Sequence, residues 1–181
     1  MMWRNSSQQW GWAMVAMHWL SALTVCALFG LGLWMVELTY YDSWYRTAPF
    51  LHKSIGISLF LLTLFRLLWR FRDVSPQLLD SHSALEKNAA VFAHVLLYVL
   101  LLAVMFSGYL ISTADGRPIE VFDLFSVPAT IYGLDHQEDV AGDVHRWLAW
   151  SLIILAAVHG AAAVKHHVVD KDTTLKRMWV R

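Results

Sequence analysis

Residues 143–163 read DVHRWLAWSLIILAAVHGAAA, an apolar stretch with a histidine near each end, His145 and His159. These two histidines are 14 residues apart. At about 100° per residue, an α-helix brings them back to within about 40° of one face, about 21 Å apart along the axis. An ionisable side chain within a membrane-length apolar helix indicates a functional site. Two on one face at different depths predict either two stacked cofactors or a relay.

The composition of the whole chain is typical of an integral membrane protein. Of its 181 residues, 57% are hydrophobic and 15% are charged, whereas soluble domains carry about 25% charged residues. Ten Trp residues suit the two interfaces of a bilayer. The single cysteine, Cys26, excludes an intrachain disulfide framework or a CxxC site. The basic residues are explained by membrane orientation, so no nucleic-acid partner is indicated.

Four segments are long enough to cross a hydrocarbon core of about 30 Å, which takes roughly 20 residues. We therefore predict an all-α, integral membrane four-helix bundle that forms a single domain over residues 1–181. The expected transmembrane helices are 11–36, 51–69, 88–113 and 144–168, and a long periplasmic loop spans 114–142. The first segment is longer than the apolar core of a signal peptide, so we expect it to be retained. In the long loop, residues 119–125 are a candidate for a short amphipathic helix on the outer membrane surface.

The orientation follows from lysine and arginine near the helix ends, which are enriched on the cytoplasmic side. With a cytoplasmic N-terminus, ten of them fall on that side: Arg4, Arg66, Arg70, Arg72, Lys87, Lys165, Lys171, Lys176, Arg177 and Arg181. Four fall on the opposite side: Arg46, Lys53, Arg117 and Arg146. Both termini are therefore expected to be cytoplasmic. The long loop has seven acidic residues and one basic residue between 115 and 143, which makes the outer face acidic.

Four histidines pair by depth across the expected helices. His52, in the first turn of the second helix, lies level with His145, and His18 in the first helix lies level with His159. Facing neutral imidazoles from different helices are typical axial ligands of haem iron, and bundle cores build cofactor sites in this way. The pairing favours haem over interhelical hydrogen bonds or a proton path. Structural zinc is disfavoured, because it needs four ligands at one point.

Two further residues are candidates near the inner pair. His94 lies about two turns into the third helix, where it is an alternative to His18 as a ligand or a hydrogen-bond partner of a cofactor or quinone. Arg66 is 14 residues after His52, so it shares that face at the inner depth. There its planar guanidinium would bind a haem propionate or a quinone oxygen. The alternative is an arginine that extends to the cytoplasmic interface together with Arg70.

The other sequence features near these pairs have simpler explanations. Small residues lie beside both pairs, at Gly30, Gly32, Gly56 and 160–163. They would admit a flat macrocycle, although close packing of transmembrane helices explains them more simply. The remaining histidines fall in expected loops or at the membrane surface, and we expect them to be solvated: His82, His136, His166 and His167.

Short motifs surround these positions: Met17-His18-Trp19-Leu20, Leu51-His52-Lys53-Ser54-Ile55-Gly56, Ala93-His94-Val95-Leu96-Leu97-Tyr98, Val144-His145-Arg146-Trp147, His159-Gly160-Ala161, and the tail Lys165-His166-His167 with residues 170–178. As a set, they resemble the bacterial cytochrome b561 family over nearly the whole chain. The resemblance implies a four-helix di-haem b protein of the bacterial inner membrane. It implies axial ligands at His18 and His159 on the cytoplasmic side and at His52 and His145 on the periplasmic side. It implies no ligand at His94.

On this resemblance we expect a membrane cytochrome with two haem b groups that relays electrons between a periplasmic partner and the quinone pool, with ubiquinone as substrate. Some members oxidise superoxide and reduce ubiquinone. The acidic outer loop argues against steering an anion, although Lys53 and Arg146 beside the outer ligands would form a local positive spot. Two alternatives are a haem-bearing anchor subunit of a larger redox complex and a haem-free, histidine-lined transporter of protons or metal. All of these functional hypotheses place the protein in a lipid bilayer, and each of them is compatible with an oligomer.

Overall fold

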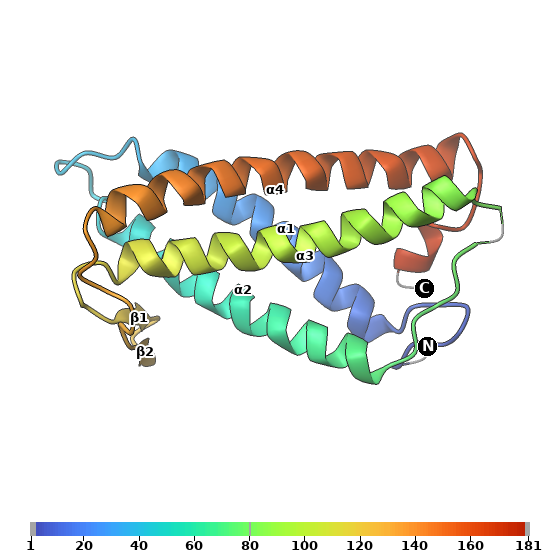
Figure 1. Ribbon diagram of the computed structural model, residues 1–181, viewed down its shortest axis with the longest axis horizontal. Helices are drawn as coiled ribbons and strands as arrows, with labels where there is room; N and C mark the ends of the chain where they lie inside the picture. The colour runs from blue at the N-terminus through green and yellow to red at the C-terminus, as the bar shows by residue number, and fades with distance from the viewer. Residues whose placement is uncertain (1–2, 80, 180–181) are drawn as a thin grey trace.

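The computed structural model describes residues 3–79 and 81–179. Four long helices follow one another along the chain: α1 (Trp12–Met35), α2 (Thr47–Arg72), α3 (Ala84–Ser112) and α4 (Gln137–Val168). Between α3 and α4, strand β1 (Ile119–Val121) pairs with antiparallel strand β2 (Phe125–Val127), and a short 3-10 turn, η1 (Lys176–Met178), lies near the C-terminus. Both termini lie at one end of the bundle and the β-hairpin at the other (Figure 1). We call these the terminal end and the hairpin end.

The four helices are long and apolar enough to cross a membrane. Large apolar side chains point away from the bundle along them, such as Leu23, Phe65, Phe92, Val95, Ile154 and Val158. Continuous apolar surface of this kind is unfavourable in water but favourable in lipid. Helices are also stable in lipid because they satisfy their own backbone hydrogen bonds. The predicted integral membrane four-helix bundle is therefore confirmed.

Three helices begin earlier than the sequence analysis expected, for local reasons. The start of α3 is set by a capping box, in which the Ser83 hydroxyl accepts from the Glu86 N–H at 3.3 Å and the Glu86 carboxylate accepts from the Ser83 N–H at 2.9 Å. In α2, Pro49 lies in the first turn, where a missing N–H is tolerated. In α4, Glu138 and Asp139 lie in the first turn and stabilise the positive end of the helix dipole.

The segment 119–125 corrects one expectation, because it forms the first strand and turn of the hairpin and not an amphipathic helix. Ile119 and Val121 are buried, and Glu120 between them is exposed. This alternation has the period of two that a strand imposes, whereas a helix would need a period near 3.6. Three residues of alternation are too few to separate the two periods from the sequence.

The turn of the hairpin is set by backbone conformation and by a contact with α2. Phe122 and Asp123 have φ angles of 50° and 57°, as the central residues of a tight hairpin turn require. The Leu124 N–H closes this turn on the Val121 carbonyl at 2.9 Å. The Phe122 N–H donates to the Ser54 hydroxyl at 3.1 Å, so the hairpin is fastened to the first turns of α2.

At the terminal end, the C-terminal tail runs back across the bundle. The Trp19 indole N–H of α1 donates to the Met178 carbonyl at 2.7 Å. The Arg177 guanidinium donates to the carbonyl of Gln77, in the α2–α3 loop, at 2.8 Å. The tail therefore lies against both the first helix and the loop that precedes α3.

Candidate functional site

Near the hairpin end, His52 of α2 and His145 of α4 face each other with ring centres 6.3 Å apart. The Nδ1 atom of His145 lies 2.9 Å from the Val104 carbonyl of α3 and 3.1 Å from the Ser107 hydroxyl. An N–H at Nδ1 donates to this carbonyl and leaves the lone pair on Nε2, as in most metal-bound histidines. The sequence-predicted outer pair is therefore brought together, and we call it the hairpin-end layer.

Two glycines, which have no side chain, leave space for these two imidazoles. A Cβ placed on Gly108 would lie 3.1 Å from Cε1 of His145, and a Cβ on Gly32 would lie 3.3 Å from Cε1 of His52. Both distances are closer than ordinary van der Waals contact between carbon atoms, about 3.5–4.0 Å. Gly32 therefore accommodates an imidazole directly, a more specific role than the close helix packing considered from the sequence.

Near the terminal end, three histidines converge where two were paired from the sequence. The ring centres of His18 in α1 and His159 in α4 are 6.5 Å apart. His94 of α3 also lies beside His159, with ring centres 5.1 Å apart. We call these three residues the terminal-end layer. All five histidines expected inside the bundle are thus placed in two layers.

The separation of facing imidazoles tests whether each pair fits a haem iron. An imidazole nitrogen binds a metal ion at about 2 Å, and the ring centre lies about 1 Å farther out, so two axial imidazoles have centres about 6 Å apart. The pairs His52–His145 and His18–His159, at 6.3 and 6.5 Å, meet this requirement. The spacing of 5.1 Å between His94 and His159 is too short for it. The residues present therefore fit two axial pairs.

Arg66 lies inside the bundle at the terminal-end layer. Its guanidinium nitrogen Nη2 is 3.1 Å from Nδ1 of His18, and its Cζ atom lies 5.4 Å from the ring centre of Tyr98. Within the described residues, Nε of Arg66 and the hydroxyl of Tyr98 are buried without a hydrogen-bond partner. A buried polar group without a partner costs about 1–3 kcal/mol. These two neighbouring groups are therefore candidates for binding an oxygen-bearing ligand, and the role of Arg66 stays a prediction.

A cavity of about 1310 Å³ at the hairpin end is lined by all four helices and includes His52 and His145. Cavities of about 300–1,000 Å³ hold drug-sized ligands, so this one is large enough for a macrocycle. Three basic side chains line it: Lys53, Arg117 and Arg146. Arg146 pairs with Asp143, and Arg117 pairs with Asp115. Among the ion pairs of residues 3–79 and 81–179, none involves Lys53.

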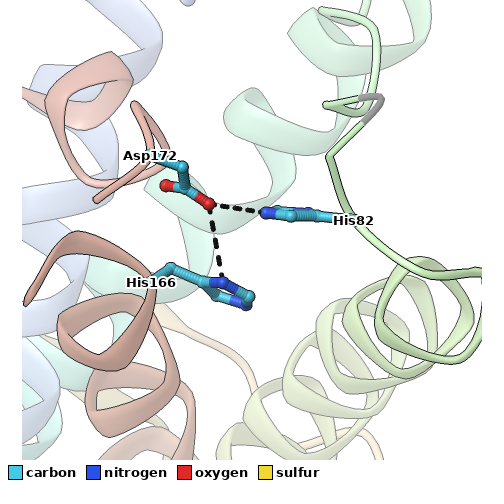
Figure 2. Close-up of side chains that lie close together, drawn as sticks. All are labelled: His82, His166 and Asp172. Atoms are coloured by element: carbon cyan, nitrogen blue, oxygen red, sulfur yellow. Dashed lines mark hydrogen bonds and ion pairs between the residues drawn. The ribbon is translucent and has the colours of Figure 1, made fainter. Parts of the chain in front are cut away.

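A separate polar cluster at the terminal end was missed from the sequence. His82 from the α2–α3 loop, His166 from the end of α4 and Asp172 from the tail converge there (Figure 2). Their side chains are 13%, 14% and 9% exposed, so the expectation that His82 and His166 are solvated was wrong. The periodicity of a helix or strand cannot predict a contact between His82 and Asp172, which is 90 positions later in the sequence. His136, with its side chain 83% exposed, is solvated as expected.

Comparison with known proteins gives the family. The family model described as prokaryotic cytochrome b561 matches residues 9–180. The chain is 53% identical to cytochrome b561 homolog 2 of Escherichia coli (strain K12), over 96% of this chain and 93% of that protein. It is 26% identical to cytochrome b561 homolog 1 of the same strain, over 92% and 94% of the two chains. It is 28% identical to a probable superoxide oxidase of Yersinia pestis, over 91% and 92%.

The family match covers both histidine layers and all four apolar helices. A haem-binding family agrees with the separations of the facing imidazoles, 6.3 and 6.5 Å. The chain therefore belongs to the prokaryotic cytochrome b561 family, multi-pass bacterial membrane proteins that transfer electrons through haem b.

Proposed function

We propose that this protein relays single electrons across the bacterial inner membrane, between a periplasmic redox partner and the quinone pool, through two haem b groups. One observation carries the proposal: two facing histidine pairs, with centres 6.3 and 6.5 Å apart, share helix α4. The two α4 histidines lie about 21 Å apart along that helix, so one pair lies toward each end of the bundle. Bound haem supplies the one-electron chemistry, while the protein supplies ligation, a dry site and spacing.

The proposed axial ligands are His52 with His145 at the hairpin end, and His18 with His159 at the terminal end. The carbonyl of Val104 fixes the tautomer of His145, so that Nε2 points its lone pair into the bundle. His94 is proposed as a hydrogen-bonding neighbour and not as a ligand, because its ring is too close to that of His159.

A quinone site is proposed beside the terminal-end layer. The unpaired donors of Arg66 and Tyr98 lie there, and His94 adds an imidazole. Donors of this kind suit a quinone carbonyl oxygen, whose negative charge grows as the quinone is reduced. The same guanidinium and hydroxyl donors would also suit a haem propionate. Ubiquinone is the proposed substrate.

The orientation is proposed from charge. Both termini lie at the end where the sequence places most of its lysine and arginine, and that end is proposed to be cytoplasmic; Arg181, one of the ten, lies outside the described residues. The hairpin end is then periplasmic. Four carboxylates line the cavity there, at Asp115, Glu138, Asp139 and Asp143. Three basic side chains nearly balance these carboxylates, so the proposed docking surface for a positively charged donor protein is the whole of residues 115–143, which have seven acidic residues and one basic residue.

The first test is a haem count and a reduced-minus-oxidised visible spectrum of the full chain, purified in a mild detergent. About two haem b per chain are expected, and a soluble ubiquinone analogue should reoxidise the reduced protein. A count near one would overturn the two-carrier relay. Two haems without reoxidation by the quinone would overturn the quinone assignment. A colourless protein from cells with ample haem would instead favour the haem-free transporter.

A second candidate, superoxide oxidation coupled to quinone reduction, is favoured by the 28% identity to a probable superoxide oxidase. Of the three basic side chains in the cavity, Lys53 is the one without an ion pair among the described residues, so it is the candidate to attract an anion. The Arg117 guanidinium is occupied, because it donates to Asp115 at 2.6 Å and lowers the pKa of that carboxyl. Arg146 is likewise paired with Asp143.

The steering role of Lys53 is testable with a superoxide source and a quinone analogue. At low salt, Lys53→Gln should slow superoxide-driven quinone reduction several-fold, and the difference from wild type should shrink as salt screens the charge. Arg146→Gln is the matched control and should change the rate less. Equal rates for both variants and wild type would remove the steering idea, and a wild type inactive with superoxide would remove the candidate.

A further inference from the structure

The cluster at the terminal end has the geometry of a small ligand set. Nε2 of His82 lies 2.7 Å from Oδ2 of Asp172, and Nδ1 of His166 lies 3.5 Å from the same oxygen and 2.7 Å from Oδ2 of Asp170. The two imidazole rings stack with centres 4.4 Å apart. Figure 2 shows one ring nitrogen of each histidine directed at the carboxylate of Asp172. One donor atom from each of the three residues lies within 4.8 Å of the others.

These spacings are close to those imposed by a bound metal ion. Atoms that bind one tetrahedral ion at about 2.1 Å lie about 3.4 Å from one another. The His166–Asp172 spacing already has this value, and the His82–Asp172 spacing needs to open by less than 1 Å. Two imidazoles with one carboxylate are a ligand set that zinc and other late first-row metals prefer.

The charge around the cluster also favours a divalent cation. Asp170 accepts from Nζ of Lys165 at 2.7 Å, and Glu86 accepts from the same amine at 3.2 Å. Within the described residues, this one ammonium group thus pairs with two carboxylates, whereas the ion pairs of Asp172 are with the two histidines only. With neutral imidazoles, this network carries a surplus of negative charge beside His82, His166 and Asp172, whose side chains are largely shielded from solvent, and a divalent ion would neutralise it.

The three residues come from three segments that are otherwise joined by a few polar contacts, such as that of Arg177 with the Gln77 carbonyl and that of Lys165 with Glu86. His82 belongs to the α2–α3 loop, His166 to the last turn of α4, and Asp172 to the tail beyond it. The tail continues to Met178, whose carbonyl accepts from Trp19, and Trp19 is the neighbour of His18 in α1. An ion bound at the cluster would therefore hold the tail against the end of the bundle next to the terminal-end layer.

We propose that His82, His166 and Asp172 bind a divalent transition-metal ion, with Zn²⁺ the best match, which fastens the C-terminal tail to the α2–α3 loop. This site is separate from the histidines that face one another inside the bundle. The proposed metal site does not depend on the proposed electron relay, because none of its ligands belongs to either histidine layer.

The test is Zn²⁺ titration by calorimetry of the haem-loaded full chain in mild detergent, with an affinity tag that contains no histidine. Wild type should bind one Zn²⁺ per chain. The double variant His82→Gln, His166→Gln should weaken binding more than about 100-fold, because losing a residue that only orients a ligand already costs about 10–100-fold. The matched control His136→Gln, at an exposed histidine near the hairpin end, should bind like wild type.

Two single variants locate the ion within the cluster. Asp172→Asn should abolish high-affinity binding. Asp170→Asn removes a carboxylate that lies 2.7 Å from Nδ1 of His166 but is also held by Lys165, and it should leave most of the binding. The reverse result would place the ion on Glu86, His166 and Asp170, and would overturn the proposal. Undiminished binding in the double variant would overturn it as well. The visible spectrum of each variant reports whether the bundle is intact.

A measurement on wild type alone makes the test independent of folding defects. Zinc X-ray absorption of the Zn²⁺-loaded protein should show nitrogen and oxygen neighbours at about 2.0–2.1 Å, with the outer-shell signal of two imidazoles. A shell of oxygen atoms only would overturn the proposal. In the same sample, Zn²⁺ should slow trypsin cleavage after Lys171 and Lys176, and it should not do so in the double variant.

Discussion

The two histidine layers are built from the same residue type but in different surroundings. At the hairpin end, His52 and His145 face each other alone, each imidazole lies against a glycine, and a backbone carbonyl accepts from His145. At the terminal end, His18 and His159 share their layer with a third histidine and with a buried guanidinium. Within the described residues, the first layer leaves one buried imidazole nitrogen without a partner, Nδ1 of His52, whereas the second leaves a guanidinium N–H of Arg66 and the hydroxyl of Tyr98.

This difference indicates different tasks. A layer with tight sterics, in which a backbone carbonyl holds one of the two imidazoles, is suited to hold one cofactor. A layer with spare buried donors is suited to bind a second, polar molecule beside its cofactor, since unpaired donors are otherwise costly. This reasoning supports the proposal that quinone exchanges electrons with the terminal-end layer and that an outside partner exchanges them with the hairpin-end layer.

The largest expected effect comes from removing one axial histidine at a time. His52→Ala should empty the hairpin-end layer and His159→Ala the terminal-end layer, each lowering the haem count from about two to about one per chain. The two remaining spectra should differ, because the surroundings differ. His94→Ala should keep both haems, as should the surface control His136→Ala. Loss of a haem in His94→Ala, with none lost in His18→Ala, would contradict the ligand assignment.

The second effect tests the spare donors. Arg66→Gln should slow quinone reduction by about 10–100-fold, since a hydrogen bond from a charged donor contributes about 1.5–3 kcal/mol. It should also lower the reduction potential of the terminal-end haem, because a buried positive charge favours the added electron. The hairpin-end haem should keep its potential. Arg70→Gln, one turn farther along α2, is the control. Equal effects of both variants would mean that Arg66 acts only through general surface charge.

The third effect tests the tight sterics of the hairpin-end layer. A methyl group at Gly108 would lie 3.1 Å from His145, so Gly108→Ala should destabilise the protein by about 1–3 kcal/mol and loosen the hairpin-end haem. Gly32→Ala, at 3.3 Å from His52, should have a smaller effect. Gly30→Ala meets no atom within 4 Å and is the control. Thermal unfolding followed by haem absorbance measures all three. Identical curves would show that the layer is looser than its distances indicate.

The layers themselves were predictable because their signals are local. Apolar runs set the four helices, and the 14-residue spacing from His145 to His159 places both on one face of α4. Helix order along the chain then puts His52 and His18 at matching depths, and the structure brings both pairs together. The surroundings of each layer were less predictable. The contacts of Val104 and Gly108 with His145 depend on how α3 packs along α4, which no spacing within one helix reports.

Features formed by irregular segments were not predictable. The hairpin depends on left-handed backbone at Phe122 and Asp123 and on anchoring by Ser54, so its short strands gave no clear period. The cluster of His82 with Asp172 joins residues 90 positions apart through a loop and a tail. Hydrophobic patterning carries no information about such a contact, because neither segment belongs to a periodic element.

The smallest expected effect tests whether His145 in the hairpin-end layer depends on polar groups other than the Val104 carbonyl. Ser107→Ala removes a hydroxyl 3.1 Å from Nδ1 of His145, but the Val104 carbonyl at 2.9 Å remains to accept the N–H. The loss should therefore be limited to about 0.5–1.5 kcal/mol, with both haems retained. The potential of the hairpin-end haem should rise slightly, because a less polarised imidazole is a weaker donor to iron. Ser151→Ala, at an exposed α4 serine bonded to its own helix, is the matched control. A lost haem in Ser107→Ala would show that one carbonyl does not hold His145, and that this layer, like its counterpart, depends on a wider polar network.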